Sequence, residues 1–241
     1  IILAFFDAAF FIFFIAEIGM NYNGHFPLCY ELIKHAKFSG ANIVKFQLGW
    51  RDKPGEINQL DKAKIKQLYE WADYFEIDLM FSIISIDAFN TIKQFKPNKI
   101  KIASRTLRDN IDLAKKIVDL KIETFVSLGM WENKKKLPFK KKKDLYYLWC
   151  KSKYPTDNKD LANVFPAKFD QNNIVGYSDH SIGIEMPILA ISRGAQIIEK
   201  HFTLDKSDTT IRDHVLSATP EEFLQMTKIG KDIFKKLRLK I

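Results

Sequence analysis

Short apolar runs alternate along this chain with longer amphipathic stretches, and this alternation restricts the possible folds more than any other feature. Each run has five or six residues and is rich in β-branched and aromatic residues, which is typical of strands buried on both faces. The predicted strands are Phe13–Glu17, Ile43–Leu48, Asp78–Ile83, Lys99–Ala103, Thr124–Leu128, Leu145–Cys150, Ile174–Ser178 and Ile197–Phe202. Helical periodicity predicts helices over Pro27–Ser39, Asp61–Phe75, Ile86–Phe95, Asp109–Leu120, Asp157–Lys168, Ile184–Arg193 and Pro220–Leu237.

Eight strands with helices between them indicate a parallel sheet. The number eight, in a chain of 241 residues, favours a closed (β/α)8 TIM barrel over an open doubly wound sheet. We expect one barrel domain over residues 1–241, with residues 1–12 as an apolar N-terminal extension of undefined structure. No GxGxxG or Walker sequence follows any strand, which argues against a dinucleotide site or a P-loop.

The formal net charge is +9, and much of the excess lies in the lysine run Lys134–Asp144. Such a run is usually a solvated loop or helix face, so we expect only a short helix or a loop between the fifth and sixth strands. The run has neither the interleaved aromatic residues nor the module of a nucleic-acid-binding protein, and we predict no nucleic-acid partner. A positive field would help an anionic small substrate to reach its site.

The first twenty residues are strongly apolar, but they resemble neither a signal peptide nor a membrane anchor. They have no basic n-region, Asp7 interrupts them, and no flanking charges would anchor a span. We therefore expect no membrane association and interpret Phe13–Glu17 as the first buried strand. Two cysteines, Cys29 and Cys150, make no disulfide framework, which favours a reducing, cytoplasmic location.

Polar side chains gather at the ends of the predicted strands, where (β/α)8 enzymes carry their functional residues. The seventh strand runs into His180 and the eighth into His201. The other candidates are Glu17, Lys45, Gln47, Lys101, Ser104, Ser127, Ser152, Tyr154, Ser178 and Asp213. One such residue alone is more often a hydrogen-bonded core residue than a ligand. Many charged groups at one barrel mouth, however, cost desolvation free energy unless a ligand compensates.

These residue types indicate a chemistry. Lysines and serines at one rim are suited to a phosphate and a carboxylate. Two histidines on adjacent strands can hold one divalent metal ion, with water and substrate completing its coordination. Glu17 and Asp213 could orient that water or move a proton. From the residues alone, we predict metal-assisted chemistry on a small phosphorylated acid.

Several motifs together resemble the N-acetylneuraminate (sialic acid) synthase family from about Phe13 to Leu237. They are IAEIGMNYNG, VKFQ, KIAS, SLGM, C-x-S-x-YP, GYSDHSIGIE, IIEKHFTLD and RDH, in this order. The resemblance implies an enzyme that condenses phosphoenolpyruvate with an N-acylated amino sugar, such as N-acetylmannosamine, and releases phosphate to form a nonulosonic acid. It also implies a divalent metal ion, typically Mn²⁺ but with Mg²⁺ or Co²⁺ as alternatives, on the histidines that match His180 and His201. Such products serve capsule or other surface polysaccharides.

The resemblance also implies individual roles. Glu17 matches a glutamate near the metal-bound water and the reacting carbons, and Asp213 matches an acid that contacts the sugar and that water. The phosphoenolpyruvate positions are matched by Lys45, Lys101, Ser104, Ser127 and Ser178, and the sugar-side positions by Gln47 and Tyr154; Ser152, within the C-x-S-x-YP motif, is added as a substrate-binding residue. Asp179 and Glu199 flank the histidines and are open to either a supporting or a structural interpretation.

The chain departs from the family pattern within several motifs and at its end. Thr106 stands where the family often has an acidic residue, and Arg105 precedes it in place of glycine. Many members carry a C-terminal antifreeze-like domain that contributes a sugar-binding arginine within a dimer. Here the chain ends at Ile241, so the resemblance covers the barrel domain only. A homodimer is possible, and Arg105 or Arg212 is a hypothetical replacement for that arginine.

Two other functions compete with the synthase. One is a different phosphoenolpyruvate aldol-type synthase that acts on a sugar phosphate, which would need further basic residues. The other is a catalytically weak barrel of the same family that binds a sugar or a partner. Metal content separates the weak barrel from the enzymes, and the choice of sugar separates the two enzymes.

Overall fold

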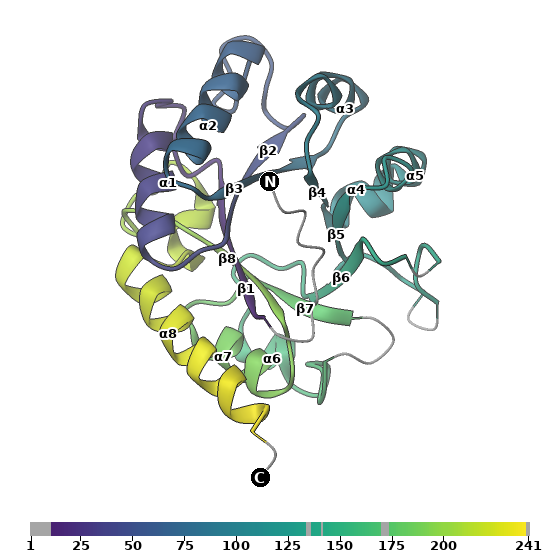
Figure 1. Cartoon of the computed structure of the whole chain (residues 1–241), viewed down its shortest axis with the longest axis vertical. Coiled ribbons are helices and arrows are strands. Elements are labelled where there is room, and N and C mark those ends of the chain that lie inside the picture. The colour runs from purple at the N-terminus through teal and green to yellow at the C-terminus, as the bar shows by residue number, and fades with distance from the viewer. Residues whose placement is uncertain (1–10, 134–135, 141, 170–173, 240–241) are drawn as a thin grey trace.

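The computed structural model describes residues 11–133, 136–140, 142–169 and 174–239, and its centre is a closed barrel of eight parallel strands (Figure 1). The strands are β1 (Phe13–Gly19), β2 (Ile43–Leu48), β3 (Asp78–Ile83), β4 (Lys99–Ile102), β5 (Glu123–Ser127), β6 (Leu145–Cys150), β7 (Ile174–Asp179) and β8 (Ile197–His201). They follow one another in sequence order, and β1 pairs with β8 to close the ring. The predicted (β/α)8 fold is confirmed, and the predicted strand ends differ by one or two residues.

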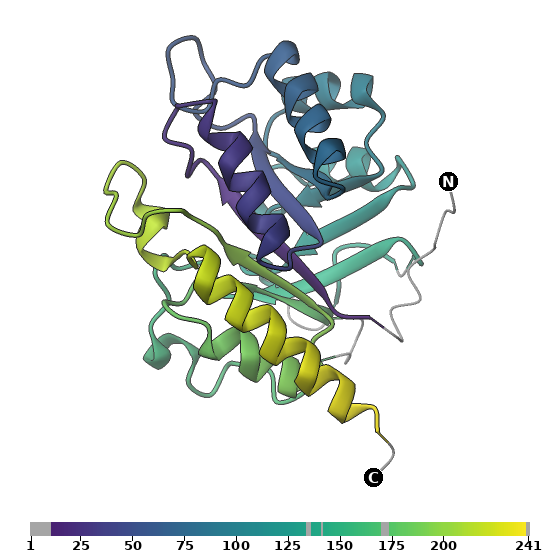
Figure 2. The ribbon, with the colours of Figure 1, turned by 60° about the vertical axis from the view of Figure 1, so that its left-hand side comes forward.

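Helices lie outside the strands (Figure 1). They are α1 (Leu28–Phe38), α2 (Lys62–Tyr74), α3 (Ile86–Ile92), α4 (Ser104–Asp109), α5 (Ile111–Val118), α6 (Asn158–Leu161), α7 (Glu185–Ser192) and α8 (Pro220–Leu237), with short 3₁₀ turns η1 (Lys93–Phe95) and η2 (Arg212–Leu216). The last helix packs against α1 and α7, and Figure 2 shows α1 and α8 side by side. None of the described residues between β5 and β6 is helical, as the lysine-rich sequence predicts.

Two predicted helices are wrong in extent. The helix expected over residues 157–168 is only α6, because Asn163 adopts a left-handed φ of 62° and Pro166 disfavours helical backbone before it. The helix expected from residue 109 is preceded by a separate helix, α4, that begins directly after β4. Asn110 leaves helical geometry between α4 and α5, and its side chain caps α5 by accepting from Leu113 N at 3.0 Å.

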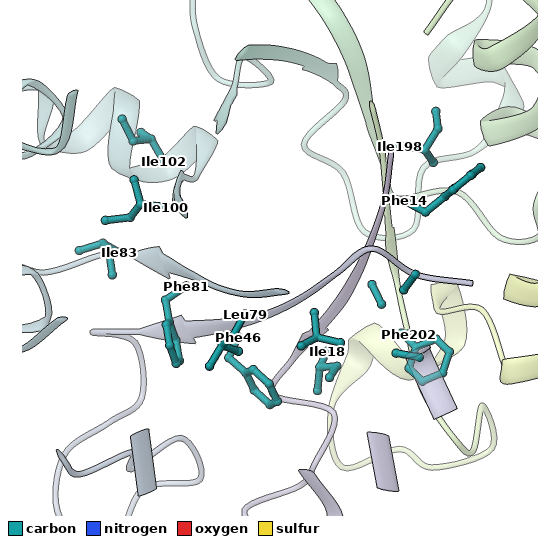
Figure 3. Packing of buried hydrophobic residues seen from close by; sticks show 14 of the residues in the cluster. Phe14, Ile18, Phe46, Leu79, Phe81, Ile83, Ile100, Ile102, Ile198 and Phe202 are labelled. Carbon is teal, nitrogen blue, oxygen red and sulfur yellow. The ribbon is translucent and has the colours of Figure 1, made fainter. Parts of the chain in front are cut away.

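Apolar side chains form two layers. The larger layer lies between the strands and the helices, and Figure 3 shows part of it around Phe46, Phe81 and Phe202. The smaller layer fills the barrel interior with Ile15, Ile43, Met80, Phe125, Tyr146, Leu148 and Ile197. Because this interior layer closes the barrel toward the amino-terminal ends of the strands, a cavity can open only at their carboxyl ends.

The apolar N-terminus contributes β1 to the barrel, where it is buried between β2 and β8. The remainder of the predicted extension, residues 1–10, lies outside the described residues. Among the helices that the structure describes, none has both the length and the apolar character needed to cross a membrane.

Candidate active site

A cavity of about 480 Å³ lies at the carboxyl ends of the strands, and all eight strands or the loops after them contribute to its wall. The structure brings every candidate residue of the sequence analysis into this one wall. They are Glu17, Lys45, Gln47, Lys101, Ser104, Ser127, Ser152, Tyr154, Ser178, His180, His201 and Asp213. The alternation of side chains along each strand explains the arrangement, since residues two apart on a strand face the same side.

Two lysines and two carboxylates form the floor of the cavity. Lys101 Nζ lies 2.7 and 2.6 Å from the two carboxylate oxygens of Glu199, and Lys45 Nζ lies 2.7 Å from Glu17 Oε2. Lys45 also approaches Glu199 Oε2 at 3.7 Å, which joins the two pairs. Ser178 Oγ donates to Glu199 Oε1 at 2.7 Å. The floor is therefore one network that links strands from both halves of the barrel.

Mutual attraction keeps Glu199 and Lys45 ionised, whereas burial lowers the pKa of Lys101. Burial alone would raise the pKa of Glu199, but the charges of Lys101 and Lys45 hold that pKa well below its ordinary value. Burial alone would lower the pKa of Lys45, but Glu17 and Glu199 outweigh it and the pKa is raised. Both groups are thus charged at neutral pH, which buried groups tolerate only when they are paired.

Glu17 is positioned by its neighbours as well as by Lys45. Its Oε1 accepts from Gln47 Nε2 at 3.0 Å. The chain bulges directly after Glu17, and Gly19 has a left-handed φ of 56°. A Cβ on Gly19 would lie only 3.2 Å from Glu17 Oε1 and 3.3 Å from Gln47 Nε2. Glycine therefore leaves room for this carboxylate–amide pair at the edge of the cavity.

The two histidines face each other across the ends of β7 and β8, with ring centres 5.6 Å apart. His180 Nδ1 lies 2.8 Å from Lys151 O, and because a carbonyl only accepts, Nδ1 carries the proton. The lone pair is then on Nε2, the usual arrangement of a metal-binding histidine. Burial and the neighbouring His201 lower the pKa of His180 to about 4. His180 is therefore neutral, as metal binding requires.

Several buried polar atoms of the cavity have no hydrogen-bond partner among the residues that the structure describes. Among them are Ser127 Oγ, His201 Nδ1 and Asp213 Oδ1. Asp213 Oδ2 is 4.0 Å from His201 Nδ1, so a carboxylate and an imidazole share this corner. Within the described residues no cluster of three or more His, Cys, Asp or Glu is arranged to hold a metal ion. The protein donors that fit an ion here are therefore the two imidazoles, with water or substrate oxygens completing the shell.

The loop that carries Asp213 is tied to the loop after β1. Asn21 Nδ2 donates to Phe202 O and to Ser217 Oγ, each at 2.9 Å. Ser217 Oγ in turn donates to Asp213 O at 2.6 Å. Asp213 is thus held by a buried network that begins at Asn21, four residues after Glu17 in the sequence.

The structure gives different places to Asp179 and Glu199, whose roles the sequence left open. Glu199 faces the cavity, whereas Asp179 faces away from it and pairs with Lys200 at 2.6 Å. Strand alternation could have predicted this difference, because Glu199 is two residues before the inward-facing His201 and Asp179 is directly before the inward-facing His180.

Thr106 also lies outside the cavity wall, since its Oγ1 donates to Ile83 O at 2.9 Å. The wall also contains Arg105, which its place after the fourth strand had singled out as a candidate cation, and Trp50, which no sequence signal singled out.

A sequence model of the NeuB family matches residues 55–240. The chain belongs to the NeuB family. This membership confirms the family resemblance that the motifs predicted.

Similar proteins and a similar solved structure support this family membership. The chain is 32% identical to pseudaminic acid synthase of Campylobacter jejuni, over 89% of this chain and 71% of that protein. It is 37% identical to an uncharacterised protein of Methanocaldococcus jannaschii, over 89% of this chain and 68% of that protein. The structure also resembles that of N-acetylneuraminic acid synthetase from Leptospira borgpetersenii, with a TM-score of 0.78, 28% identity and coverage of 96% of this chain and 86% of that one. The chain is thus an enzyme homologue of the sialic-acid synthase type.

Proposed function

We propose that this NeuB-family chain condenses phosphoenolpyruvate with an N-acylated amino sugar, N-acetylmannosamine or a relative, to a nonulosonic acid with release of phosphate. One observation carries the proposal: all the residues that the motifs select converge on a single cavity with a charged floor. Relatives named as pseudaminic acid and N,N'-diacetyllegionaminic acid synthases support the reaction type.

Phosphoenolpyruvate has two anionic groups, and the wall offers matching donors. Lys45 and Lys101 supply positive charge at the floor. Ser104 Oγ accepts from Gly129 N at 3.0 Å and lies 3.3 Å from Cys150 Sγ. Sulfur is a weak acceptor, so a substrate oxygen can compete for the hydroxyl proton of Ser104. Ser127 Oγ has no other partner among the described residues. Because charge-assisted hydrogen bonds to carboxylate and phosphate are the strong ones, these four residues are suited to contact the anionic groups of the substrate.

The reaction joins C3 of phosphoenolpyruvate to the aldehyde carbon of the open-chain sugar. Water then adds at C2, and the resulting tetrahedral carbon expels phosphate to leave the 2-keto acid. Glu17, fixed by Lys45 and Gln47, lies where it can accept the proton of that water or donate to the new alkoxide. Asp213 holds the sugar side. His180 and His201 would hold a divalent ion, which supplies Lewis-acid polarisation of the aldehyde when bound.

The test is phosphate release from phosphoenolpyruvate with Mn²⁺ and a panel of N-acetylmannosamine, its 6-deoxy diamino relatives and its 6-phosphate. We expect release with one neutral amino sugar, and loss of release on chelation and in His180→Ala. The half-exposed His35 gives the matched control, and His35→Ala should retain full activity, since His35 is on the outer helix α1. Release only with the 6-phosphate would replace the proposal by a sugar-phosphate synthase. No release by a folded protein that binds Mn²⁺ would replace it by a sugar-binding barrel.

A further inference from the structure

Positive charge at the floor of the cavity is already matched by carboxylates. Lys101 is paired with Glu199 and Lys45 with Glu17, at 2.6–2.7 Å. The floor alone therefore has little net charge to balance a substrate with a phosphate and a carboxylate. The cavity wall also contains three arginines, Arg51, Arg105 and Arg212. These arginines decide how much excess positive charge the cavity offers.

Arg105 is the best positioned of the three. It follows Ser104 in the first turn of α4, between two buried residues, so its backbone is fixed. Its guanidinium carbon lies 4.6 Å from the centre of the Trp50 ring. Within the part of the chain that the structure describes, Arg105 forms no hydrogen bond and no ion pair. Arg212 also lies over an aromatic ring, 5.0 Å from the centre of Tyr154, but its side chain is 70% exposed and lies 3.5 Å from Asp213 Oδ1.

The backbone of Trp50 is held by buried structure. The fully buried Asn58 donates from Nδ2 to Trp50 O at 2.9 Å and to Gln47 O at 3.1 Å. Asn58 Oδ1 accepts from the buried Tyr22 hydroxyl at 2.5 Å. Gly49 has a φ of 88°, and a Cβ there would lie 2.6 Å from Ser85 N, so the loop packs closely against the start of α3. The backbone that carries Trp50 is therefore fixed, and its partly exposed ring lies in the cavity wall.

A guanidinium stacked on an aromatic face keeps its in-plane N–H groups free for a ligand. We propose that Arg105, held on Trp50, forms an anion subsite of the cavity that binds a phosphate or carboxylate group of a substrate. The group is either the phosphate of phosphoenolpyruvate or an acidic substituent of the sugar acceptor. This inference rests on the proposed function for the identity of the substrates, but not for the presence of the subsite.

The test is calorimetric binding with four folded proteins: the wild type, Arg105→Ala, Arg105→Lys and Arg108→Ala. Arg108 is a matched control, because it is on the same helix but is exposed and paired with Asp109 outside the cavity. The ligands are inorganic phosphate, phosphoenolpyruvate, N-acetylmannosamine and its 6-phosphate. Loss of one bidentate charged contact predicts a ~10- to 100-fold weaker affinity for the bound anion in Arg105→Ala. Arg105→Lys should recover part of it, and Arg108→Ala should match the wild type.

The pattern of losses identifies the source of the anion. Weaker binding of both phosphate and phosphoenolpyruvate assigns the subsite to phosphoenolpyruvate. Unchanged phosphoenolpyruvate binding with weaker binding of the sugar 6-phosphate alone assigns it to the acceptor. Equal affinities of the wild type and Arg105→Ala for every ligand would overturn the inference. These are binding measurements, so a protein that shows the losses without any turnover would refute the proposed function and not the subsite.

Discussion

Neighbouring strands β7 and β8 carry two charged groups that face opposite sides of the barrel wall. The outer pair, Asp179 and Lys200, lies 2.6 Å apart with both side chains fully buried. Its hydrogen bonds are complete: Asp179 Oδ1 accepts from Tyr177 Oη at 2.6 Å and from Ser181 Oγ at 2.7 Å, and Lys200 Nζ donates to Ser181 O. The inner group, Glu199 with Lys101, is as tightly paired but faces the cavity.

The difference lies in what surrounds each group. The outer pair is enclosed by the protein and has no room for a ligand. The inner group borders a cavity of about 480 Å³ whose wall contains buried polar atoms without hydrogen bonds to the described residues, Ser127 Oγ among them. A buried ion pair with every hydrogen bond satisfied serves the fold, whereas a pair beside unsatisfied donors is suited to bind substrate. Strand β8 thus contributes Lys200 to a structural pair and Glu199, with Lys101 of β4, to a functional one.

The largest effect is expected from Lys200→Met. This change leaves the Asp179 carboxylate buried without its counter-charge, so the free energy of unfolding should fall by about 3–5 kcal/mol. Urea denaturation measures it. The double variant Asp179→Asn, Lys200→Met should lose less than Lys200→Met alone, because no buried charge remains. A double variant that is less stable than the single one would show that the two residues do not act as a pair.

The pair also predicts a pH dependence. Burial alone would raise the pKa of Asp179, but Lys200 and the surrounding donors hold it below its ordinary value. A carboxyl with a lowered folded pKa contributes stability above its unfolded pKa of ~3.9 and loses it as the pH falls through the folded value. The stability difference between the wild type and Asp179→Asn should therefore be constant near neutral pH and shrink below about pH 4.

A smaller effect is expected from metal binding at the inner face. Mn²⁺ at one hundred times its dissociation constant should raise the free energy of unfolding by about 2.7 kcal/mol, as for any ligand that binds only the folded state. Thermal denaturation with and without Mn²⁺ measures this. His180→Ala should abolish the increase, and His35→Ala should keep it. If the increase survived in His180→Ala, the ion would be bound elsewhere.

The smallest effects come from a matched pair of serines. Ser127→Ala removes an inner hydroxyl that has no described partner, so KM for phosphoenolpyruvate should rise by ~2- to 10-fold with unchanged stability. Ser181→Ala removes an outer hydroxyl bonded to Asp179, so unfolding should cost about 1 kcal/mol less with unchanged KM. Initial rates and urea titrations distinguish them. If both variants changed KM, or both changed the free energy of unfolding, the distinction between an inner and an outer hydroxyl would be wrong.

Much of this arrangement was predictable from the sequence because the signals are periodic. Buried strands are continuous apolar runs, and strand ends in a barrel meet at one mouth, so the residue pattern alone places His180, His201 and Lys101 together. Strand alternation would also have placed Glu199 inside and Asp179 outside. The early end of α6 was less predictable, because it depends on a left-handed Asn163 and on Pro166.

The Arg105–Trp50 contact could not be predicted. The two residues come from the loop after β2 and the start of α4, and α4 itself was not expected. Their contact depends on the close approach of Gly49 to Ser85 and on the buried Asn58. Such loop geometry is set by tertiary packing and leaves no repeating pattern in the sequence.

Lys99 and Lys101 provide the most direct test of the claim that the inner charges bind substrate. Both are on β4 and face the barrel interior, but Lys99 pairs with Asp78 and Glu123 at the amino-terminal ends of the strands, away from the cavity. The measurement is calorimetric titration of phosphoenolpyruvate into the wild type, Lys99→Met and Lys101→Met, each verified as folded by circular dichroism. We predict that Lys101→Met binds at least ~30-fold more weakly and that Lys99→Met binds like the wild type. Equal binding by the two variants would contradict the account.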